Sequence, residues 1–147
     1  MFSIKFLDNS FNEEPFGEKA CCGVITINAF QEQFVSPTTY WSQEDYERQW
    51  ITAISQILGG ANSSCLITSM YDPKLAEFIL WWPLYREGNI IFIQNHILFM
   101  NEISGEFDPW NLQPFIPPHE TYTEEGECIS EWEVTIEDLE SFIKPIL

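Results

Sequence analysis

The stretch EFILWWPLYREGNIIFIQNHILFMN, residues 77–101, decides the fold class of this chain. Two apolar runs, rich in β-branched and aromatic residues, flank the short turn Arg86–Asn89, which is the pattern of a β-hairpin. In the second run, alternate positions place four apolar residues on one face, namely Ile91, Ile93, Ile97 and Phe99. The opposite face is also largely apolar. Two apolar faces predict central strands covered on both sides, or a strongly curled sheet.

Further strands are predicted on both sides of this hairpin. The candidates are Phe2–Leu7, Cys22–Val35 with a break near Asn28, Cys65–Tyr71 and Ile129–Thr135. A polar segment with Pro15 and Gly17, Asp8–Lys19, is expected to form a turn region between the first two. The order of these elements, with few helices between them, predicts an α+β fold with a mainly antiparallel, curved β-sheet.

One long helix and a short C-terminal helix complete the predicted fold. The long helix covers Ser42–Leu58, where Ser42 and Asp45 form an approximate capping box and the apolar residues follow one helical stripe. Gly59 and Gly60 end it. Thr135 and the acid three residues later begin the short closing helix in the same way.

Length and composition predict a single folded domain over residues 1–147. Apolar residues make up 45% of the chain and aromatic residues 16%, enough for a real core. The most apolar run, Phe78–Tyr85, is too short to span a bilayer, so no membrane association is expected. The four cysteines have no metal-binding or disulfide spacing, which favours reduced thiols in a cytoplasmic protein.

The charge of the chain is its most unusual property. Asp and Glu number 23 against 6 Lys and Arg, for a formal net charge of −17. No Lys or Arg lies between Arg86 and Lys144, while twelve acids lie between Glu102 and Glu140. Such a field repels nucleic-acid backbones, and one-sided charge suits a basic protein partner better than solubility alone.

Motifs for catalysis are nearly absent. The sequence has no nucleophile elbow, phosphate-binding loop or metalloprotease motif, and it predicts no catalytic residue, metal ligand or cofactor. His96 is expected to be a hydrogen-bonded residue within a strand, and His119 a solvent-exposed turn residue. Acid pairs, namely Glu13–Glu14, Glu44–Asp45 and Glu124–Glu125, are too common here to mark acid–base chemistry.

The segment Glu102–Cys128 is rich in Pro, Gly and acid, and it is unusually long for a passive loop. Asp108 and Pro109 are expected to cap a short helical turn within it. Trp110 is either a contact for a partner or a lid packed on the sheet. The candidate partner-binding residues are Asp108, Trp110, Glu120, Glu124, Glu125, Glu127, Glu131 and Glu133.

Several short matches give the chain a resemblance to a known family. They are Tyr40–Trp41, Asp45–Tyr46, Trp50, the run from Ile67 to Pro73, Leu84–Tyr85, Gln94–Asn95, Phe115–Ile116 and Ile129–Trp132. With these residues the chain resembles the immunity proteins of bacterial contact-dependent growth inhibition systems. It is most similar to the Enterobacter branch, whose toxin domain resembles ribosome-cleaving colicins and cuts ribosomal RNA.

The resemblance implies a cytoplasmic, non-enzymatic protector that binds one basic cognate toxin domain, as a monomer in a 1:1 complex. It also implies a curved fold similar to the Whirly single-strand-binding proteins. The protector would cover the toxin's basic substrate-binding surface or a site beside it. Two alternatives stay open. One is a carboxylate- or metal-dependent enzyme using Glu120–Glu127, and the other is a Whirly-like protein that binds or mimics nucleic acid.

Overall fold

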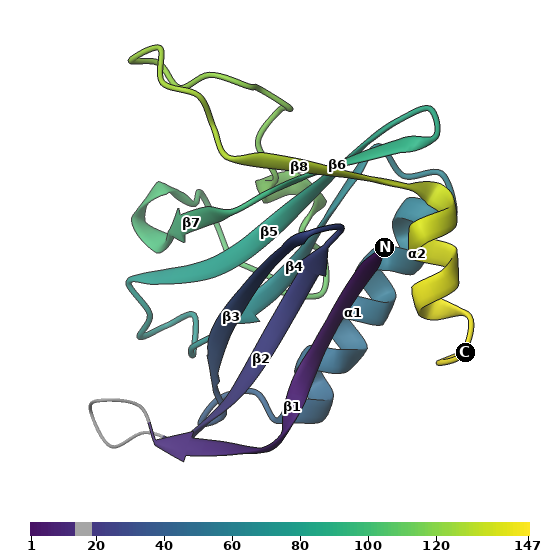
Figure 1. Cartoon of the computed structure of the whole chain (residues 1–147). Helices are drawn as coiled ribbons and strands as arrows, with labels where there is room; N and C mark the ends of the chain where they lie inside the picture. The colour runs from purple at the N-terminus through teal and green to yellow at the C-terminus, as the bar shows by residue number, and fades with distance from the viewer. Residues whose placement is uncertain (14–18) are drawn as a thin grey trace.

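The computed structural model of this chain describes residues 1–13 and 19–147, with only the backbone for residues 8–13 (Figure 1). The predicted turn residues Pro15 and Gly17, and Glu14 of the first acid pair, lie outside the described residues. The elements are β1 (Phe2–Glu13), β2 (Lys19–Ile27), β3 (Phe30–Pro37), α1 (Gln43–Leu58), β4 (Ser63–Ser69), β5 (Phe78–Glu87), β6 (Ile90–Gln94), β7 (His96–Phe99), the 3₁₀ turns η1 (Met100–Glu102) and η2 (Gln113–Phe115), β8 (Glu131–Thr135) and α2 (Ile136–Ile143).

The strands form two antiparallel sheets. The N-terminal sheet has the order β1-β2-β3, and the larger sheet has the order β4-β5-β6-β8 with β7 also paired to β5. Both helices lie on the same side of the molecule, on the right in Figure 1. The predicted α+β class, antiparallel pairing and two helices are confirmed, although the strands divide into two sheets and do not form one. The likeness to Whirly proteins stays a prediction.

The turns within the hairpins follow the sequence. The predicted break near Asn28 is a tight turn between β2 and β3, and Asn28 adopts a positive φ of 55° there. The predicted hairpin turn at Arg86–Asn89 joins β5 to β6, with Gly88 at a φ of 63°. A positive φ costs glycine nothing and asparagine little, so these residues fix both turns.

The first strand is longer than predicted. The pattern ends it at Leu7, but β1 continues to Glu13 and pairs with β2 beyond an irregularity between Phe6 and Phe11. The prediction that the turn region begins at Asp8 is therefore wrong. The extended backbone of β2 supplies hydrogen-bond partners to this polar segment, and such pairing overrides the weak strand preference of its side chains.

The decisive hairpin has a break that the pattern does not show. The second arm is interrupted at Asn95, so that β6 pairs with one half of β5 and β7 with the other, in the same register. One face of this sheet meets the N-terminal sheet, because Trp132 of β8 stacks on Phe30 at 4.2 Å and lies 5.7 Å from Trp82. The opposite face is covered by the segment that follows η2.

Helix α1 begins at the predicted capping box. The Ser42 hydroxyl accepts from the Asp45 amide, and the Asp45 carboxylate accepts from the Ser42 amide at 2.9 Å. The buried face of α1 covers the outer edge of β4 and forms side-chain hydrogen bonds to it. The buried Gln49 amide donates to the Cys65 carbonyl at 2.7 Å and accepts from the Ile67 amide at 2.9 Å, as a neighbouring strand would. The helix therefore covers an edge that would otherwise be open to pairing.

Helix α2 closes the fold from the other end of the chain. Thr135 and Asp138 form the predicted capping box, and Phe142 contacts Phe2 edge to face at 5.3 Å. Trp81 and Trp82 of β5 are 1% and 2% exposed and belong to the core. Among the described residues, no helix is both long and apolar enough to cross a membrane.

Candidate partner-binding surface

Three of the predicted partner-binding acids lie together at the tip of a small hairpin. Residues 121–129 turn back on themselves, with the Thr123 amide donating to the Glu127 carbonyl at 2.8 Å. Gly126 occupies the tip with a φ of 84°. This hairpin projects from the body of the molecule at the upper left of Figure 1. Glu124, Glu125 and Glu127 are all exposed on it, so we name it the acidic hairpin.

Glu131 is committed to contacts within the molecule. Its carboxylate Oε2 accepts from Gln94 Nε2 at 2.7 Å and lies 2.6 Å from His119 Nε2, and its side chain is 18% exposed. Such a group is costly to leave without partners once it is buried. Glu131 therefore links β6, β8 and the loop that carries His119, and its Oε2 already has two partners within the molecule.

His119 is not the solvent-exposed turn residue that the sequence suggests. Its ring stacks on Tyr85 at 4.7 Å and tilts against Phe92 at 5.0 Å, and its side chain is 20% exposed. Nδ1 lies 3.3 Å from a Glu87 carboxylate oxygen. The prediction fails because Pro117–Pro118 reads as a loop signal, whereas the sheet below offers two aromatic rings that the loop can cover. Pro117 itself accepts a hydrogen bond from the Tyr85 hydroxyl at 2.9 Å.

His96 has the predicted hydrogen-bonded structural role. Its Nε2 lies 2.7 Å from the Gln94 side-chain oxygen. Burial lowers the pKa of His96, so the ring stays neutral near pH 7. Within the described ranges, no group of three or more His, Cys, Asp or Glu side chains is arranged to hold a metal ion.

Asp108 and Trp110 lie away from the acidic hairpin. Asp108 begins a hydrogen-bonded turn, in which its carboxylate accepts from the Trp110 amide at 2.9 Å, and the next helical turn, η2, starts separately at Gln113. The Trp110 ring packs against Trp41 at 5.0 Å and lies under the Arg48 guanidinium at 5.2 Å. It is still 40% exposed, so Trp110 is a lid over the start of α1 that keeps one open face.

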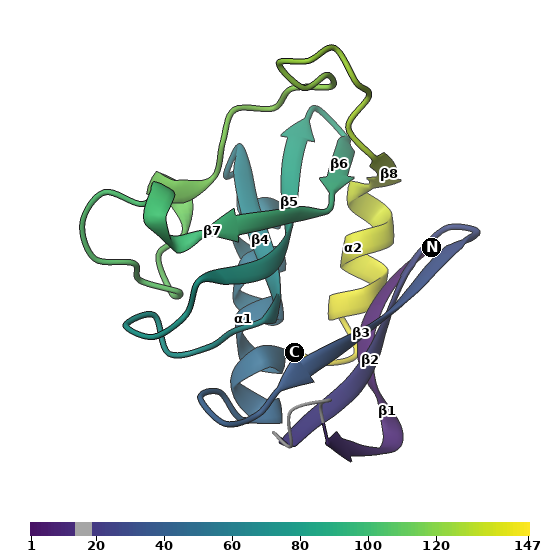
Figure 2. The ribbon, with the colours of Figure 1, turned by 90° about the vertical axis from the view of Figure 1, so that its left-hand side faces the viewer.

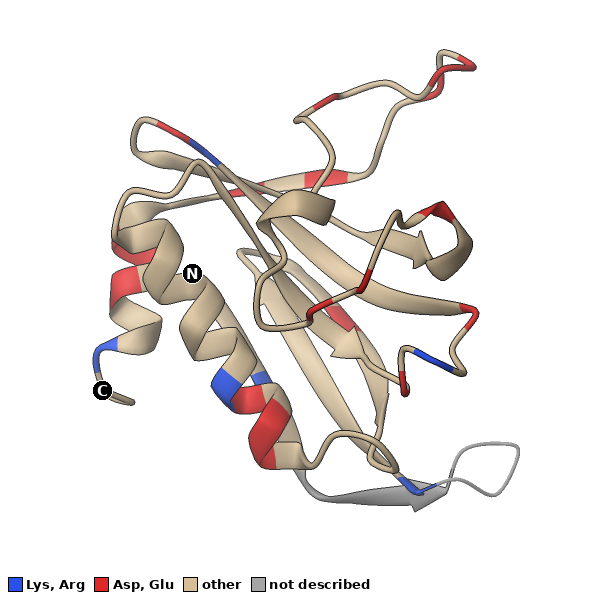
Figure 3. Ribbon diagram, turned by 180° about the vertical axis from the view of Figure 1, so that it is seen from behind, with Lys and Arg blue, Asp and Glu red and all other residues tan. Residues whose placement is uncertain are grey.

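The acids do not gather on one face. Figure 3 shows Asp and Glu on the acidic hairpin, on the long loop, in the first turn of α1 and on α2. Glu120 and Glu133 are exposed, and their backbone carbonyls accept side-chain hydrogen bonds from Gln94 and Asn28. Of the eight predicted residues, three acids therefore form one compact group on the acidic hairpin, and the other five lie outside that group.

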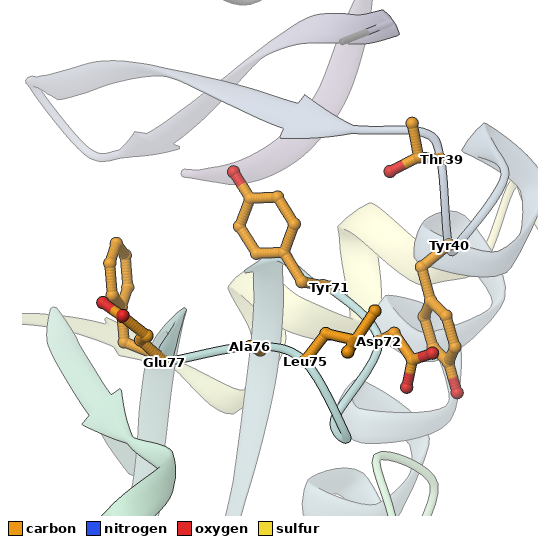
Figure 4. A pocket seen from close by; sticks show the side chains of 8 residues that line it. Thr39, Tyr40, Tyr71, Asp72, Leu75, Ala76 and Glu77 are labelled. Carbon is orange, nitrogen blue, oxygen red and sulfur yellow. The ribbon is translucent and has the colours of Figure 1, made fainter. Parts of the chain in front are cut away.

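The structure also contains a surface that the sequence prediction missed. Next to the start of β5 lies a pocket of about 530 Å³, lined by side chains that include Tyr40, Tyr71 and Leu75 (Figure 4). Phe78 lines one end of it and contacts Phe99 of β7. The apolar residues of the 77–101 stretch, which contains Phe78 and Phe99, were the signal for the strand side of this surface. That pattern cannot tell which part of a face the rest of the chain leaves uncovered.

Comparison with known proteins shows which family the chain belongs to. The model of the CdiI N-terminal domain matches residues 36–142. The immunity protein CdiI of Enterobacter cloacae is 33% identical over 126 residues, which cover 86% of each chain. The chain belongs to the CdiI family. A solved structure titled as the CdiA-CT/CdiI toxin and immunity complex from Enterobacter cloacae contains a chain of the same fold, with a TM-score of 0.89, 32% identity and coverage of 99% and 98% of the two chains.

The CdiI match includes every candidate surface described above. Residues 36–142 run from the end of β3 into α2, and they contain the acidic hairpin, Trp110 and the pocket beside β5. Strands β1 and β2 and most of β3 lie outside the matched range. The eight candidate partner-binding residues and the pocket are therefore within the range that the model of the CdiI N-terminal domain matches.

Proposed function

We propose that this chain neutralises a cognate toxin of a contact-dependent growth inhibition system by binding the C-terminal domain of that toxin. The single observation that carries the proposal is the fold match, over 99% of the chain, to a protein solved in a complex of toxin and immunity protein. Inhibition by binding needs no catalytic group. We propose that the protein is not an enzyme and that one monomer binds one toxin domain.

The chemistry of the partner follows from the charge of the chain. A formal net charge of −17 favours a basic polypeptide, and a nuclease domain must be basic to hold RNA. Complementary fields raise association rates to about 10⁸–10⁹ M⁻¹s⁻¹ at low salt. The exposed carboxylates of Glu124, Glu125 and Glu127 are placed to act in this steering, because the acidic hairpin projects from the body of the molecule (Figure 1).

The substrate of the toxin is a finer proposal. The sequence resemblance to the Enterobacter branch supports a toxin that cuts ribosomal RNA, and the protector would cover its basic substrate-binding surface. We further propose that it acts in the cytoplasm, where the toxin reaches ribosomes. Cys65 and Cys128 are free thiols, which suits a reducing compartment.

The test uses the purified chain and the toxin domain encoded beside it. Calorimetric titration should give one site per toxin molecule, and added chain should stop cleavage of ribosomal RNA in isolated ribosomes at a 1:1 ratio. A second immunity protein from an unrelated system serves as the specificity control. If the chain does not bind the toxin, or if it destroys the toxin catalytically at substoichiometric ratios, the proposal is wrong.

The charge component is tested separately. Replacing Glu124, Glu125 and Glu127 together by Gln should slow association at low salt and reduce its salt dependence, with little effect on dissociation. The positions are exposed, so the fold should be unaffected. An association rate that does not change with ionic strength in the wild-type protein would remove steering from the proposal.

A further inference from the structure

One face of the larger sheet carries large apolar side chains that remain uncovered. Phe78 is 38% exposed, Ile97 is 53% exposed and Phe99 is 46% exposed. Phe78 and Phe99 are direct cross-strand neighbours with rings 6.4 Å apart, and Ile97 lies on the same face opposite Leu80. The N-terminal sheet covers this face at Trp82 and Trp132 but leaves its other end open.

The open end continues into the pocket beside β5. Tyr40 comes from the connection between β3 and α1, and Tyr71 and Leu75 come from the loop after β4 (Figure 4). Leu75 is 82% exposed and Tyr40 is 44% exposed. We define the aromatic groove as Tyr40, Tyr71, Leu75, Phe78, Ile97 and Phe99. In Figure 2, β7 and the start of β5 lie on the side facing the reader.

The rim of the aromatic groove is acidic. Asp72 and Glu77 line the pocket itself. On the β7 side, the Glu32 carboxylate accepts a hydrogen bond from Asn95 at 3.2 Å, two residues before Ile97. The one cation of the adjoining loop is Lys74. An apolar centre inside a negatively charged rim matches a partner surface with an apolar side chain among Lys and Arg.

We propose that the aromatic groove is the main binding surface for the toxin domain, which inserts an apolar or aromatic side chain into the pocket and places basic residues on the rim. This inference rests on the proposed function. In this proposal, the aromatic groove supplies most of the binding affinity for the toxin domain, and the acidic hairpin speeds the association of the two proteins. The reason is physical, because contacts between solvated carboxylates and a partner contribute little each, while buried aromatic contacts at the centre of an interface dominate binding.

The volume and shape of the pocket suit this occupant. A space of about 530 Å³ holds one large side chain with its neighbouring backbone, and it is open on one side to admit a protein surface. The exposed groove residues include two aromatic rings already in contact with each other, which lose little side-chain freedom on binding. The groove is therefore ready to bind without rearrangement.

The test compares variants of the groove with matched variants elsewhere. Leu75→Ser and Ile97→Thr, alone and together, remove apolar surface at exposed positions. Ile146→Thr is the control for Ile97→Thr, because the two isoleucines are 50% and 53% exposed and Ile146 lies beyond α2. The equilibrium dissociation constant for the purified toxin domain is measured for each, and urea unfolding of each variant checks that the fold is intact.

We expect the double groove variant to raise the dissociation constant by about 30-fold or more, mostly through faster dissociation, and Ile146→Thr to leave it unchanged. The proposal is overturned if the wild type binds toxin and the folded double variant binds equally well. Loss of binding only in the triple Gln variant of the acidic hairpin would also overturn it. If the groove variants abolish a dimer of this chain and leave toxin binding intact, the groove belongs to a second copy and the inference is wrong. Failure of the wild type to bind toxin would instead refute the proposed function.

Discussion

Gln49 is the residue through which helix α1 holds the edge of β4, and replacing it by leucine tests that role. Its side chain is 3% exposed and bridges the Cys65 carbonyl and the Ile67 amide at 2.7 and 2.9 Å. Leucine has a similar volume but neither hydrogen-bonding group. The substitution therefore leaves one buried acceptor and one buried donor of β4 without these partners.

The magnitude follows from the two orphaned groups. Each costs about 1–3 kcal/mol when it is buried without a partner, so the sum is about 2–6 kcal/mol. The extra apolar area of leucine offsets part of this, which leaves an expected loss of about 3 kcal/mol in the free energy of unfolding. With a urea slope of about 2 kcal/mol per molar, the unfolding midpoint should fall by about 1.5 M.

The assay is urea unfolding followed by tryptophan fluorescence. Gln56→Leu is the matched control, since Gln56 lies on the same helix but is exposed, and its midpoint should change little. Size-exclusion chromatography of Gln49→Leu should also show more self-association, because the edge of β4 becomes available for pairing. If the free energies of unfolding of Gln49→Leu and Gln56→Leu differ by less than about 0.5 kcal/mol, Gln49 does not hold the edge of β4.

Three further predictions follow from the same structure. Trp50→Phe should cost about 1–2 kcal/mol more than Trp81→Phe in urea unfolding, because the Trp50 indole donates to a buried carbonyl at 2.7 Å, whereas the Trp81 indole is the buried side-chain donor without a partner among the described residues. Glu131→Ala should lower the free energy of unfolding by about 2–3 kcal/mol, and Glu133→Ala by less than about 0.5 kcal/mol, so equal effects would contradict the internal role of Glu131. The hydrogen bond from the Thr135 backbone lowers the pKa of Asp138, so this carboxylate stabilises the fold above its ordinary pKa of 3.8 and less so as the pH falls below that value. Between about pH 5 and about pH 3, the free energy of unfolding of Asp138→Asn should therefore change less than that of the wild type.

The parts of the fold that the sequence predicts well are local. The start of α1 depends on Ser42 and Asp45, three residues apart, and both hydrogen bonds form as expected. The hairpin turn depends on Gly88 and on the apolar runs beside it. In each case the signal and its structural consequence lie within a few residues, so no distant segment is needed to realise them.

The parts that fail depend on distant partners. β1 runs past Leu7 because β2 pairs with it, and His119 is covered because Tyr85 and Phe92 lie beneath it. The break at Asn95 is similarly invisible in an otherwise regular apolar run. These outcomes depend on which segments meet in space, and a single sequence read by pattern does not contain that information.

The candidate site divides in the same way. The sequence identifies candidate acids in the long loop and in the strand after it. Three of the loop acids are exposed together on the acidic hairpin, whereas Glu131 of β8 contacts Gln94 and His119. The sequence alone does not distinguish an exposed glutamate from an enclosed one. Whether its oxygens face water or a buried ring depends on the packing around it.

The sequence by itself determined the α+β class, the capped helices, the hairpin and a charge that favours a cationic partner, because composition and short-range periodicity act along the chain. Tertiary structure alone decided which apolar residues the two sheets cover and which remain open at Phe78, Ile97 and Phe99. The physical reason is that burial is a property of the whole assembly of elements. A side chain becomes core or surface only when another segment does or does not pack against it.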